Sequence, residues 1–328
     1  MRILVTGATG FLGSRTAILL AEEGHEIIAT GRNVLKAPER SSIEFISADL
    51  TQPLPEDLFK YIEAIVHCAA LSSPWGKYED FYQANVSATK QLVEHASKHK
   101  IKRFIHISSP GIYFDFKDNE NIKESYPLPV KKANFYAQTK YLAELEIFKA
   151  VEKGLPAIIL RPRAIFGAGD TALLPRVIKA NNTKFIPQMR KDNGPLCDLT
   201  YVDNVVHAIK LALNSKDDCI GQAYNITNGE HVYLHEIIKN LTKELGLKYN
   251  AKKIPYKLAF VYAGILEFIC GYLTKDKEPA FTKYSIALLY NNQTLDITKA
   301  KKELGYTPPV SMTEGFSRLV KGWNDKQN

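Results

Sequence analysis

Three tyrosine–lysine pairs four residues apart could each form a proton-transfer site: Tyr113 with Lys117, Tyr136 with Lys140, and Tyr249 with Lys253. This spacing places two side chains together only within a helix. The first pair falls in the irregular stretch YFDFKDNE, and the third lies in a predicted loop. The second pair begins a predicted helix, whose apolar side comprises Ala137, Tyr141, Leu145, Phe148 and Val151.

A phenol beside an ammonium group can act as a general acid or base. A free phenol has a pKa of about 10, and a neighbouring positive charge favours the phenolate. We therefore expect the pKa of Tyr136 to lie closer to neutrality, because Lys140 lies one turn further along. The pair follows a predicted strand that ends in Ser108 and Ser109. Ser109 could hold a substrate oxygen by a hydrogen bond.

A glycine-rich stretch near the N-terminus, VTGATGFLG, connects a predicted strand to a predicted helix. Gly7 allows the tight turn, Gly10 lets the backbone approach a pyrophosphate, and Gly13 lets the helix pack closely on the strand. The start of the helix offers N–H donors and partial positive charge. This context predicts a dinucleotide-binding turn. The same turn includes Thr9, Phe11 and Leu12.

The end of the second predicted strand, IIATGRN, indicates which dinucleotide is bound. An acidic residue there suits the ribose of NAD, whereas a cation suits the 2′-phosphate of NADP. Residues 29–33 contain no Asp or Glu, and Arg32 can bind a phosphate through its planar guanidinium. The sequence favours NADP(H), with NAD(H) as the alternative. Asp49, after the third strand, could accept a hydrogen bond from adenine.

A bound nicotinamide coenzyme also bears on the proton-transfer pair. Its positively charged nicotinamide would, like Lys140, favour the Tyr136 phenolate.

Short apolar runs alternate with helical segments through the first half of the chain. Strands are predicted at 2–6, 25–30, 43–47, 63–69, 103–108 and 157–160. Helices are predicted at 10–23, 77–99 and 134–153. This alternation implies right-handed crossovers and an α/β fold with a Rossmann-type, doubly wound parallel sheet.

The alternation of strands and helices becomes less regular after about residue 165. Further helices are predicted at 171–181, 203–214 and 232–245, with a strand at 223–227. We predict an NADP-binding domain over residues 1–165, to which 203–228 returns. A smaller, discontinuous C-terminal substrate domain would comprise 166–202 and 229–328.

The composition is that of an ordinary globular protein, with 328 residues, 45% hydrophobic and 24% charged. Four widely spaced cysteines without a Cys-x-x-Cys motif argue against zinc or disulfides, so we predict no metal site and a reducing compartment. No export signal is visible, which indicates a cytoplasmic protein. The net charge of +8 comes from scattered lysines. The basic run at 98–103 lacks interleaved aromatic residues, so we predict no nucleic-acid partner.

Residues 254–273, IPYKLAFVYAGILEFICGYL, contain only two charged side chains, Lys257 and Glu267. A helix that is apolar on every side is either buried or in contact with lipid. The stretch falls short of a transmembrane span, which takes about 20 clean apolar residues. Three interpretations remain open: a core helix of the smaller domain, the lining of an apolar pocket, or a peripheral contact with a membrane.

Five other polar side chains have predicted structural or binding roles. His67 and Cys68 end a buried strand, where we expect them to form a wall beside the cofactor. Arg161 is expected to tie its strand to a helix, and Arg163 could reach an anionic substrate. Asp203 is expected to cap the helix that follows it.

Several motifs occur in one order along nearly the whole chain. They are the glycine turn at 7–13, Asp49, HCAA at 67–70, Asn85 in NVSATKQLVEHA, SSPGIY, Tyr136 with Lys140, RPRAIFGAGD at 161–170, DLTYVDNVVHAI at 198–209, and LDITKAKKELGYTPPVSMTEG at 295–315. In this combination the chain resembles the extended short-chain dehydrogenase/reductases, the NAD(P)-dependent epimerase/dehydratase superfamily. SSPGIYFDF and DLTYVDN are most similar to its 3β-hydroxysteroid dehydrogenase-like branch, and within it to bacterial 2-alkyl-3-ketoacid reductases.

The resemblance implies roles for individual residues. Ser109, Tyr136 and Lys140 match the catalytic triad of the family, and Lys140 would also bind the nicotinamide ribose. Asn85 matches an asparagine that organises the active-site helix and a proton-relay water. The cofactor site would further include Leu50, Ala69 and Ala70. We also expect a homodimer.

We therefore predict an NADP-dependent oxidoreductase that interconverts a ketone and a secondary alcohol on a lipophilic substrate, such as a 3-ketoacid or a sterol-like ring. The alternatives are a nucleotide-sugar epimerase or dehydratase and a non-catalytic NADP-binding regulator. An intact Ser–Tyr–Lys set favours an enzyme. Many relatives read Val-Tyr-Gly where this chain has Ile112-Tyr113-Phe114, and close relatives carry Gly-Asp-Gly where it reads QMRKDNGP. We expect these departures to alter the substrate site.

Overall fold

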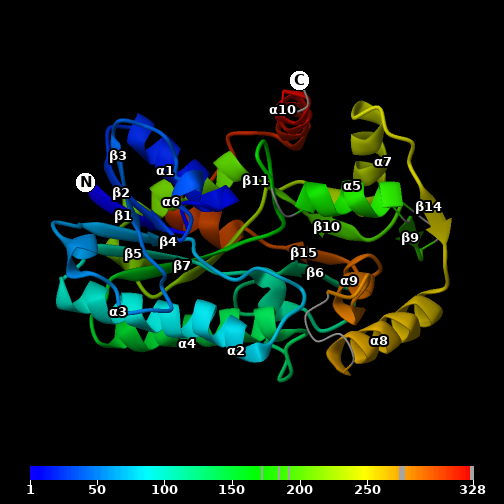
Figure 1. Ribbon diagram of the computed structural model, residues 1–328, viewed down its shortest axis with the longest axis horizontal. Helices are drawn as coiled ribbons and strands as arrows, with labels where there is room; N and C mark the ends of the chain where they lie inside the picture. The colour runs from blue at the N-terminus through cyan, green and yellow to red at the C-terminus, as the bar shows by residue number, and fades with distance from the viewer. Residues whose placement is uncertain (171–172, 184, 191–192, 273–277, 326–328) are drawn as a thin grey trace.

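The computed structural model describes residues 1–170, 173–183, 185–190, 193–272 and 278–325. Within these ranges, seven parallel strands form the main sheet in the order β12-β7-β5-β4-β1-β2-β3 (Figure 1). They are β1 (Arg2–Thr6), β2 (Glu26–Gly31), β3 (Ile43–Ser47), β4 (Ala64–His67), β5 (Arg103–Ile107), β7 (Ala157–Pro162) and β12 (Ala223–Ile226). The chain winds outward from β1 in both directions, which confirms the predicted Rossmann-type sheet.

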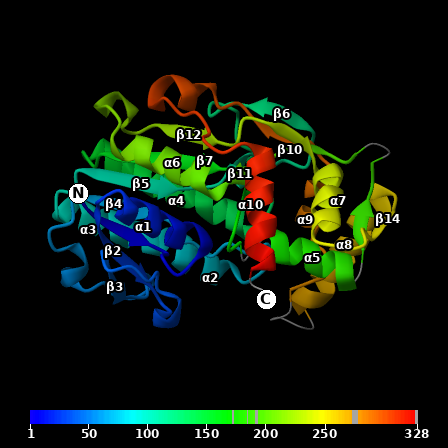
Figure 2. The same ribbon diagram turned by 90° about the horizontal axis from the view of Figure 1, so that it is seen from above.

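Helices cover both faces of this sheet. On one face lie α1 (Phe11–Glu22) and α6 (Val202–Leu213), and on the other lie α3 (Ala88–Lys98) and α4 (Phe135–Glu152) (Figures 1 and 2). Side chains alternate between the faces along each strand. Ile3 and Val5 therefore pack under α1 and α6, and Leu4 packs under α3 and α4. All three are fully buried.

The predicted helix at 77–99 is confirmed, and it contains a π-helical turn that the sequence did not indicate. The chain forms a short helix, α2 (Tyr78–Phe81), then a π-helical segment, Tyr82–Ser87, and then α3. A π-helical turn widens the helix locally, and such turns are frequent at functional sites. Here it carries Asn85, whose side chain is buried.

The second half of the chain builds a smaller unit beside the main sheet. Its strands are β13 (His231–Tyr233), β10 (Leu196–Asp198), β15 (Gln293–Leu295) and β6 (Asn119–Ile122), which form one sheet in that order, and the pairs β8 (Ile165–Phe166) with β11 (Thr200–Tyr201) and β9 (Ile186–Gln188) with β14 (Ala251–Lys253). Its helices are α5 (Leu173–Thr183), α7 (Leu234–Glu244), α8 (Tyr256–Tyr272), α9 (Lys283–Leu288) and α10 (Met312–Asn324). These elements occupy the right half of Figure 1.

The predicted division into domains stays a proposal. The strand at 223–226 pairs with β7 and α6 packs against α1, which supports the return of 203–228 to the first domain. Strand β6 lies within 1–165, yet it pairs with β15. We therefore propose that Asn119–Ile122 also belongs to the smaller, substrate-binding unit.

Two arginine–carboxylate pairs, one buried and one partly buried, join helices to this framework. Arg161 on β7 donates from Nε and Nη2 to Glu144 on α4, at 2.8 and 2.6 Å, as the sequence predicted. Arg15 on α1 donates to both carboxylate oxygens of Asp203 on α6, at 2.6 and 2.9 Å. Asp203 lies inside the first turn of α6, and Tyr201 is its N-cap. The prediction that Asp203 caps the helix is therefore wrong, because its carboxylate is turned to Arg15.

Candidate active site

The glycine turn closes tightly between β1 and α1. Gly7 has a φ of +69°, and a Cβ there would lie 2.7 Å from the backbone of Ala69. A Cβ at Gly13 would lie 2.2 Å from the carbonyl oxygen of Gly7, so the helix can approach the turn only with glycine here. Gly10 is the N-cap of α1, and Phe11 and Leu12 begin the helix. This geometry fits a pyrophosphate bound by backbone N–H groups.

The other predicted cofactor residues follow the neighbouring strands. Arg32 comes directly after β2 and is exposed, and Ala69 and Ala70 come after β4. After β3, Asp49 Oδ1 accepts hydrogen bonds from Thr51 N at 3.0 Å and Thr51 Oγ1 at 2.8 Å. The bond from Thr51 N lowers the pKa of Asp49, and the charge of Arg32 adds to this effect.

Two predicted cofactor side chains make packing contacts instead of facing solvent. The side chain of Leu50 is only 9% exposed and packs in the core under α3. A Cβ on Gly31 would lie 2.7 Å from the side chain of Thr9, so Thr9 fixes the approach of β2 to the glycine turn. The carboxyl ends of β1, β2, β3 and β4 thus meet at one edge of the sheet, where ligands bind in open α/β folds.

Ser109 lies two residues beyond β5, at the same edge. It begins a 3-10 turn, Pro110–Tyr113, and its Oγ accepts a hydrogen bond from Gly111 N at 3.2 Å. A Cβ on Gly111 would lie 3.3 Å from Ser109 Oγ and 3.6 Å from the hydroxyl of Tyr284. The hydroxyl of Tyr284, on α9, therefore reaches the neighbourhood of Ser109.

Helix α4 carries Tyr136 in its first turn and Lys140 one turn later. Asn134 is the N-cap and accepts from Ala137 N at 2.8 Å. The side chain of Lys140 is 1% exposed, and its Nζ donates to the carbonyl oxygen of Ile107 at 2.7 Å. Burial lowers the pKa of Lys140 to about 8. The ammonium group is thus held against the end of β5.

The predicted fall in the pKa of Tyr136 is wrong for the protein alone. Burial raises the pKa of this phenol, and the nearby Tyr284 raises it further. Hydrogen bonds from the hydroxyls of Ser109 and Ser72 oppose the rise. Lys140 donates its hydrogen bond to the carbonyl oxygen of Ile107 and not to the phenol. The rise in the pKa of Tyr136 that burial causes is therefore not offset by the ammonium charge. Tyr136 is protonated at neutral pH and can donate a proton.

The buried face of α4 also differs from the predicted apolar stripe. Its buried positions include the polar residues Thr139, Lys140 and Glu144. Asn85 Nδ2 donates to Thr139 Oγ1 at 3.0 Å, and Asn85 Oδ1 accepts from Leu71 N at 2.7 Å. Asn85 therefore braces the helix that carries Tyr136 against the loop after β4, which supports the organising role that the resemblance implied.

His67 and Cys68 lie at the end of β4, and their expected place beside the cofactor stays a prediction. His67 Nδ1 lies 2.8 Å from Thr6 Oγ1, and its Nε2 lies 2.9 Å from Thr89 Oγ1. Burial lowers the pKa of His67 to about 3 and raises the pKa of the Cys68 thiol to about 12. Both side chains are therefore neutral.

Two hydroxyls near the phenol of Tyr136, those of Ser72 and Tyr284, were not predicted from the sequence. Ser72 lies in the loop after β4, in HCAALSS, so its position after a strand end could have indicated it. Tyr284 comes from α9, almost 150 residues further along the chain. No local pattern predicts that a helix of the smaller unit reaches this place.

A histidine pair at the end of α3, His95 and His99, was also not predicted from the sequence. Ligand atoms of Glu56, His95 and His99 lie within 4.8 Å of one another. Glu56 Oε1 accepts from Lys98 at 2.5 Å, and Glu56 Oε2 lies 3.0 Å from His99 Nε2. Both rings also stack on Phe59. Glu56 and His99 therefore already have partners, and this group lies at the solvent side of α3.

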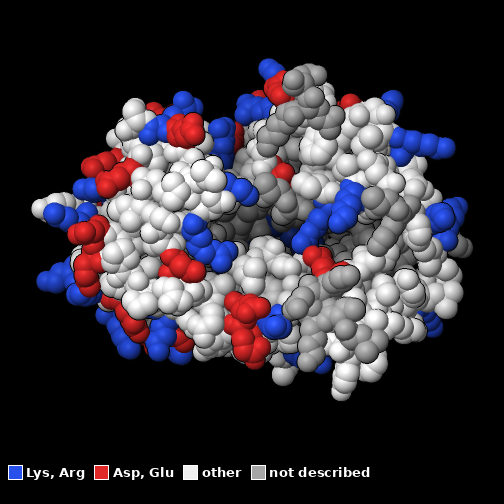
Figure 3. Space-filling view, in the orientation of Figure 1, with Lys and Arg blue, Asp and Glu red and all other residues white. Residues whose placement is uncertain are grey.

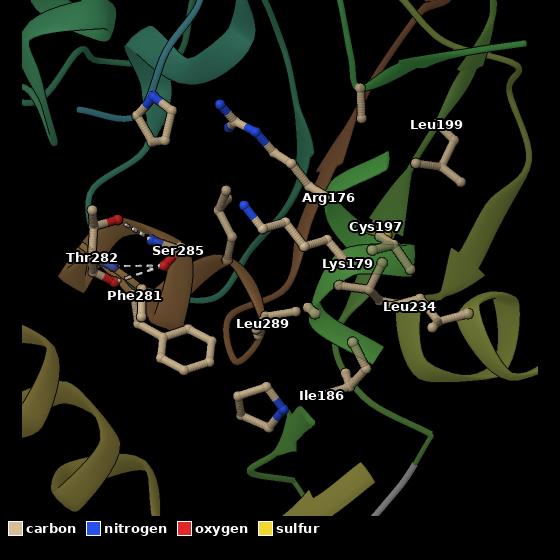
Figure 4. A pocket seen from close by; sticks show the side chains of 18 of the residues that line it. Arg176, Lys179, Ile186, Cys197, Leu199, Leu234, Phe281, Thr282, Ser285 and Leu289 are labelled. Atoms are coloured by element: carbon tan, nitrogen blue, oxygen red, sulfur yellow. Dashed lines mark hydrogen bonds between the residues drawn. The ribbon is translucent and has the colours of Figure 1, made fainter. Parts of the chain in front are cut away.

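A cavity of about 590 Å³ lies between α5, α7 and α9. Its walls are mainly apolar and include Ile186, Leu199, Leu234, Ile238, Phe281 and Leu289. Three cations also line it: Arg163, Arg176 and Lys179. Figure 4 shows Arg176 and Lys179 extending from α5 toward the side where Thr282 and Ser285 lie. In Figure 3 the face of the molecule is hollowed at its centre, with basic side chains beside the hollow.

A second cavity, of about 850 Å³, lies beside the start of α4. It is lined by Tyr141 of α4, Tyr284 of α9, and Glu267 and Gly271 of α8. Pro74 and Thr282 line both cavities, so the two spaces adjoin. Tyr284 connects the two spaces, because its phenol raises the pKa of Tyr136 and is hydrogen-bonded to Arg163, which lines the smaller cavity.

A doubly wound sheet with a glycine turn at its first crossover, with Ser109 after β5 and with Tyr136 and Lys140 on α4, is the arrangement of a short-chain dehydrogenase/reductase. The model of the NAD dependent epimerase/dehydratase family matches residues 3–227, and the chain belongs to this family. The predicted resemblance to the extended short-chain dehydrogenase/reductases is thereby confirmed.

Two curated relatives indicate which branch of the family the chain is similar to. The chain is 30% identical to a 2-alkyl-3-oxoalkanoate reductase of Stenotrophomonas maltophilia, over 97% of this chain and 98% of that protein. It is 31% identical to a decarboxylating sterol-4-alpha-carboxylate 3-dehydrogenase of Candida albicans, over 98% of this chain and 97% of that protein. These relatives are named as a reductase and a dehydrogenase, which confirms the predicted class of oxidoreductase acting on alcohol or ketone groups.

Among solved structures, the UDP-glucuronic acid 4-epimerase of Bacillus cereus in complex with NAD superposes with a TM-score of 0.77. The match covers 98% of this chain and 96% of that chain, at 23% identity. This likeness confirms the α/β fold. A nicotinamide dinucleotide as cofactor follows from the family, and the choice between NAD and NADP is a separate question.

Proposed function

We propose that this protein is an NADP(H)-dependent oxidoreductase that interconverts a ketone and a secondary alcohol on a lipophilic substrate. The observation that carries the proposal is the phenol of Tyr136, kept protonated by burial, with the hydroxyl of Ser109 beside it at the edge of the sheet that carries the glycine turn. A positioned acid of this kind contributes a rate factor of about 10²–10⁴.

In the reductive direction, Tyr136 would protonate the oxygen of the substrate carbonyl while Ser109 holds that oxygen. The nicotinamide coenzyme, when bound, supplies the hydride. Gly7, Gly10 and Gly13 would hold its pyrophosphate against the start of α1. Lys140 would bind the nicotinamide ribose, and its hydrogen bond to the carbonyl oxygen of Ile107 holds the cation at the end of β5. Asn85 would keep α4 in place through Thr139.

The preference for NADP(H) is proposed from Arg32. This side chain is exposed just beyond β2, and the neighbouring residues 29–33 offer no carboxylate to a 2′-hydroxyl. A guanidinium can bind a phosphate by two parallel hydrogen bonds. Asp49, which the charge of Arg32 helps to keep ionised, would accept from adenine at the same edge.

The proposed substrate class rests on the smaller cavity. Its apolar walls suit an alkyl chain or a ring system, and Arg163 suits a carboxylate, whereas Arg176 is already paired with Glu278 at 3.8 Å. Nε of Arg163 is buried and has no partner within the described ranges. The names of both relatives above contain a carboxylate as well as a lipophilic skeleton. We therefore propose a long-chain 3-ketoacid or a sterol-like ring with a carboxylate.

A substrate series tests this proposal. NADPH oxidation is measured with 3-ketoacids of increasing chain length, with the matching methyl ketones, and with UDP- and dTDP-sugars. We expect kcat/KM to rise with chain length, by up to about 0.8 kcal/mol per buried methylene. We also expect it to fall when the carboxylate is absent. A flat chain-length dependence together with saturable turnover of a nucleotide sugar would contradict the proposal and favour the epimerase alternative.

A protein that binds NADPH but turns over none of these compounds would instead be the non-catalytic regulator. We also retain the homodimer and the cytoplasmic location as proposals. Light scattering coupled to size-exclusion chromatography tests the first, and fractionation of cells tests the second.

A further inference from the structure

Helix α8 packs on the protein through its small residues. Ala259 and Ala263 are 7% and 0% exposed and lie in a cluster with Ile286 of α9. Gly264 also faces α9, because a Cβ there would lie 2.5 Å from Cε of Lys283. The interpretation of 254–273 as a core helix is therefore wrong. Of the helices within the described ranges, none is long and apolar enough to cross a membrane.

The large apolar side chains of α8 point to solvent. Six of them are between 52% and 74% exposed: Leu258, Val261, Tyr262, Ile265, Phe268 and Tyr272. At about 100° per residue they fall within one arc of about 120°. We call these six side chains the α8 face. Figure 3 shows mostly uncharged surface over this helix. Contiguous apolar patches of this kind mark interaction sites on soluble proteins.

Positive charge lies at the N-terminal end of the α8 face. Lys252, Lys253 and Lys257 are exposed at and just before the start of the helix. The acidic side chain of α8, Glu267, lies on the side of the helix toward α9, where it accepts a hydrogen bond from Lys283 N at 2.8 Å. Anionic lipid headgroups would neutralise these lysines. A second copy of the chain would bring the same positive charge into the interface.

The α8 face adjoins the larger cavity, which α8 lines with Glu267 and Gly271. Across this cavity, Val130 is fully exposed and Phe135 is 45% exposed. Lys131 and Lys132 lie between them in the chain and line the same space. Apolar and basic side chains therefore line the side of the cavity opposite α8, and its wall also includes Tyr284.

We propose that the α8 face docks on an anionic membrane surface, with its apolar side chains inserted among the headgroups and its lysines on the phosphates. A lipophilic substrate would then pass from the bilayer into the cavity that leads to Tyr284 and Tyr136. This second step rests on the proposed function, whereas the docking itself does not.

Vesicle co-sedimentation without substrate tests the docking. Vesicles of phosphatidylethanolamine with phosphatidylglycerol are compared with vesicles of phosphatidylcholine. The test variant is Val261→Ser/Ile265→Ser/Phe268→Ser, which removes half of the α8 face and leaves Ala259 and Ala263 in place. The control is Tyr61→Asn, which removes a lone exposed aromatic ring at a φ of +59° that asparagine tolerates.

We expect the wild type and Tyr61→Asn to bind the anionic vesicles equally, and the triple variant to bind at least about 10-fold less tightly. Lys253→Glu/Lys257→Glu should lose binding to anionic vesicles only. Failure of the wild type to sediment with anionic vesicles would overturn the proposal, as would equal binding by the triple variant. Self-association of the wild type that the triple variant lacks, seen without lipid, would also overturn it and assign the face to a second copy.

Turnover separates this proposal from the proposed function. A short, water-soluble 3-ketoacid should be reduced at equal rates by the wild type and the triple variant, which also shows that the variant is folded. A long-chain ketone presented in anionic vesicles should be reduced at least about 10-fold faster by the wild type. Docking without turnover of any ketone would contradict only the proposed function.

Discussion

The ring of Phe114 packs edge-to-face on the ring of Tyr284, with 5.2 Å between the centroids and 85° between the planes. Phe114 is 1% exposed, so this contact holds Tyr284 from the inside. The sequence singled out Phe114 because many relatives have glycine at this position. Its structural partner is a phenol whose hydroxyl lies near Ser109 and Tyr136.

Tyr284→Phe should keep this ring packing and remove only the hydroxyl. Tyr284 raises the pKa of Tyr136, so the pKa of Tyr136 should fall in the variant. Reduction needs the protonated phenol, and the rate declines as pH rises through that pKa. The alkaline limb of kcat/KM should therefore move to lower pH. Tyr290→Phe, a stacked tyrosine on another surface, should leave the limb unmoved. An unchanged limb in Tyr284→Phe would show that this phenol does not influence Tyr136.

Arg32→Ala should weaken the binding of NADPH and leave the binding of NADH almost unaffected, because only NADPH carries the 2′-phosphate. A charge-assisted contact contributes about 1.5–3 kcal/mol, which corresponds to roughly 10- to 100-fold in Kd. Fluorescence titration with both coenzymes measures the effect, and Arg40→Ala, an exposed arginine paired with Glu22, is the control. Equal losses for NADPH and NADH would mean that Arg32 does not bind the phosphate.

Glu144→Leu should destabilise the fold by about 3–5 kcal/mol, because it leaves Arg161 buried without its carboxylate. Urea unfolding measures the loss. Arg161→Leu/Glu144→Leu removes both charges and should recover most of the stability. If the double variant is no more stable than Glu144→Leu, the cost arises from packing and not from the unpaired charge.

The stability of the fold should depend on pH through Lys140. Its pKa is about 8 in the folded chain and about 10.4 when unfolded, so the unfolded chain binds more protons between these values. Stability contributed by this group therefore rises with pH above about 8. Between pH 8 and 9.5, the wild type should gain up to about 2 kcal/mol relative to Lys140→Met. Urea unfolding at each pH tests this, and parallel curves for the two proteins would contradict the depressed pKa.

The fold was predictable because its signals are local. Short apolar runs mark each strand of the main sheet, and Gly7 and Gly13 are required by contacts within 15 residues or at an adjacent strand end. Tyr136 and Lys140 were found because one helix carries both. The π-helical turn around Asn85 was not predicted, since nothing in the residue pattern of this helix distinguishes such a turn from regular α-helix.

Other features could not be read from local patterns because they depend on tertiary contacts. The pKa of Tyr136 follows from its burial and from Ser72 and Tyr284, which come from distant segments. Asp203 would cap its own helix on sequence grounds, yet Arg15, 188 residues away, binds its carboxylate. Likewise, α8 is apolar on all sides, and only the tertiary structure reveals that its small side faces inward.

The central claim is that Tyr136 is the proton donor, and single-turnover reduction of a long-chain 3-ketoacid by Tyr136→Phe tests it most directly. The phenyl ring keeps the packing and loses only the transferable proton, so the rate should fall by at least about 10²-fold. The Kd for NADPH should stay within a few-fold of the wild type, and Tyr61→Phe should react like the wild type. A Tyr136→Phe variant that reduces the substrate at the wild-type rate would contradict the claim.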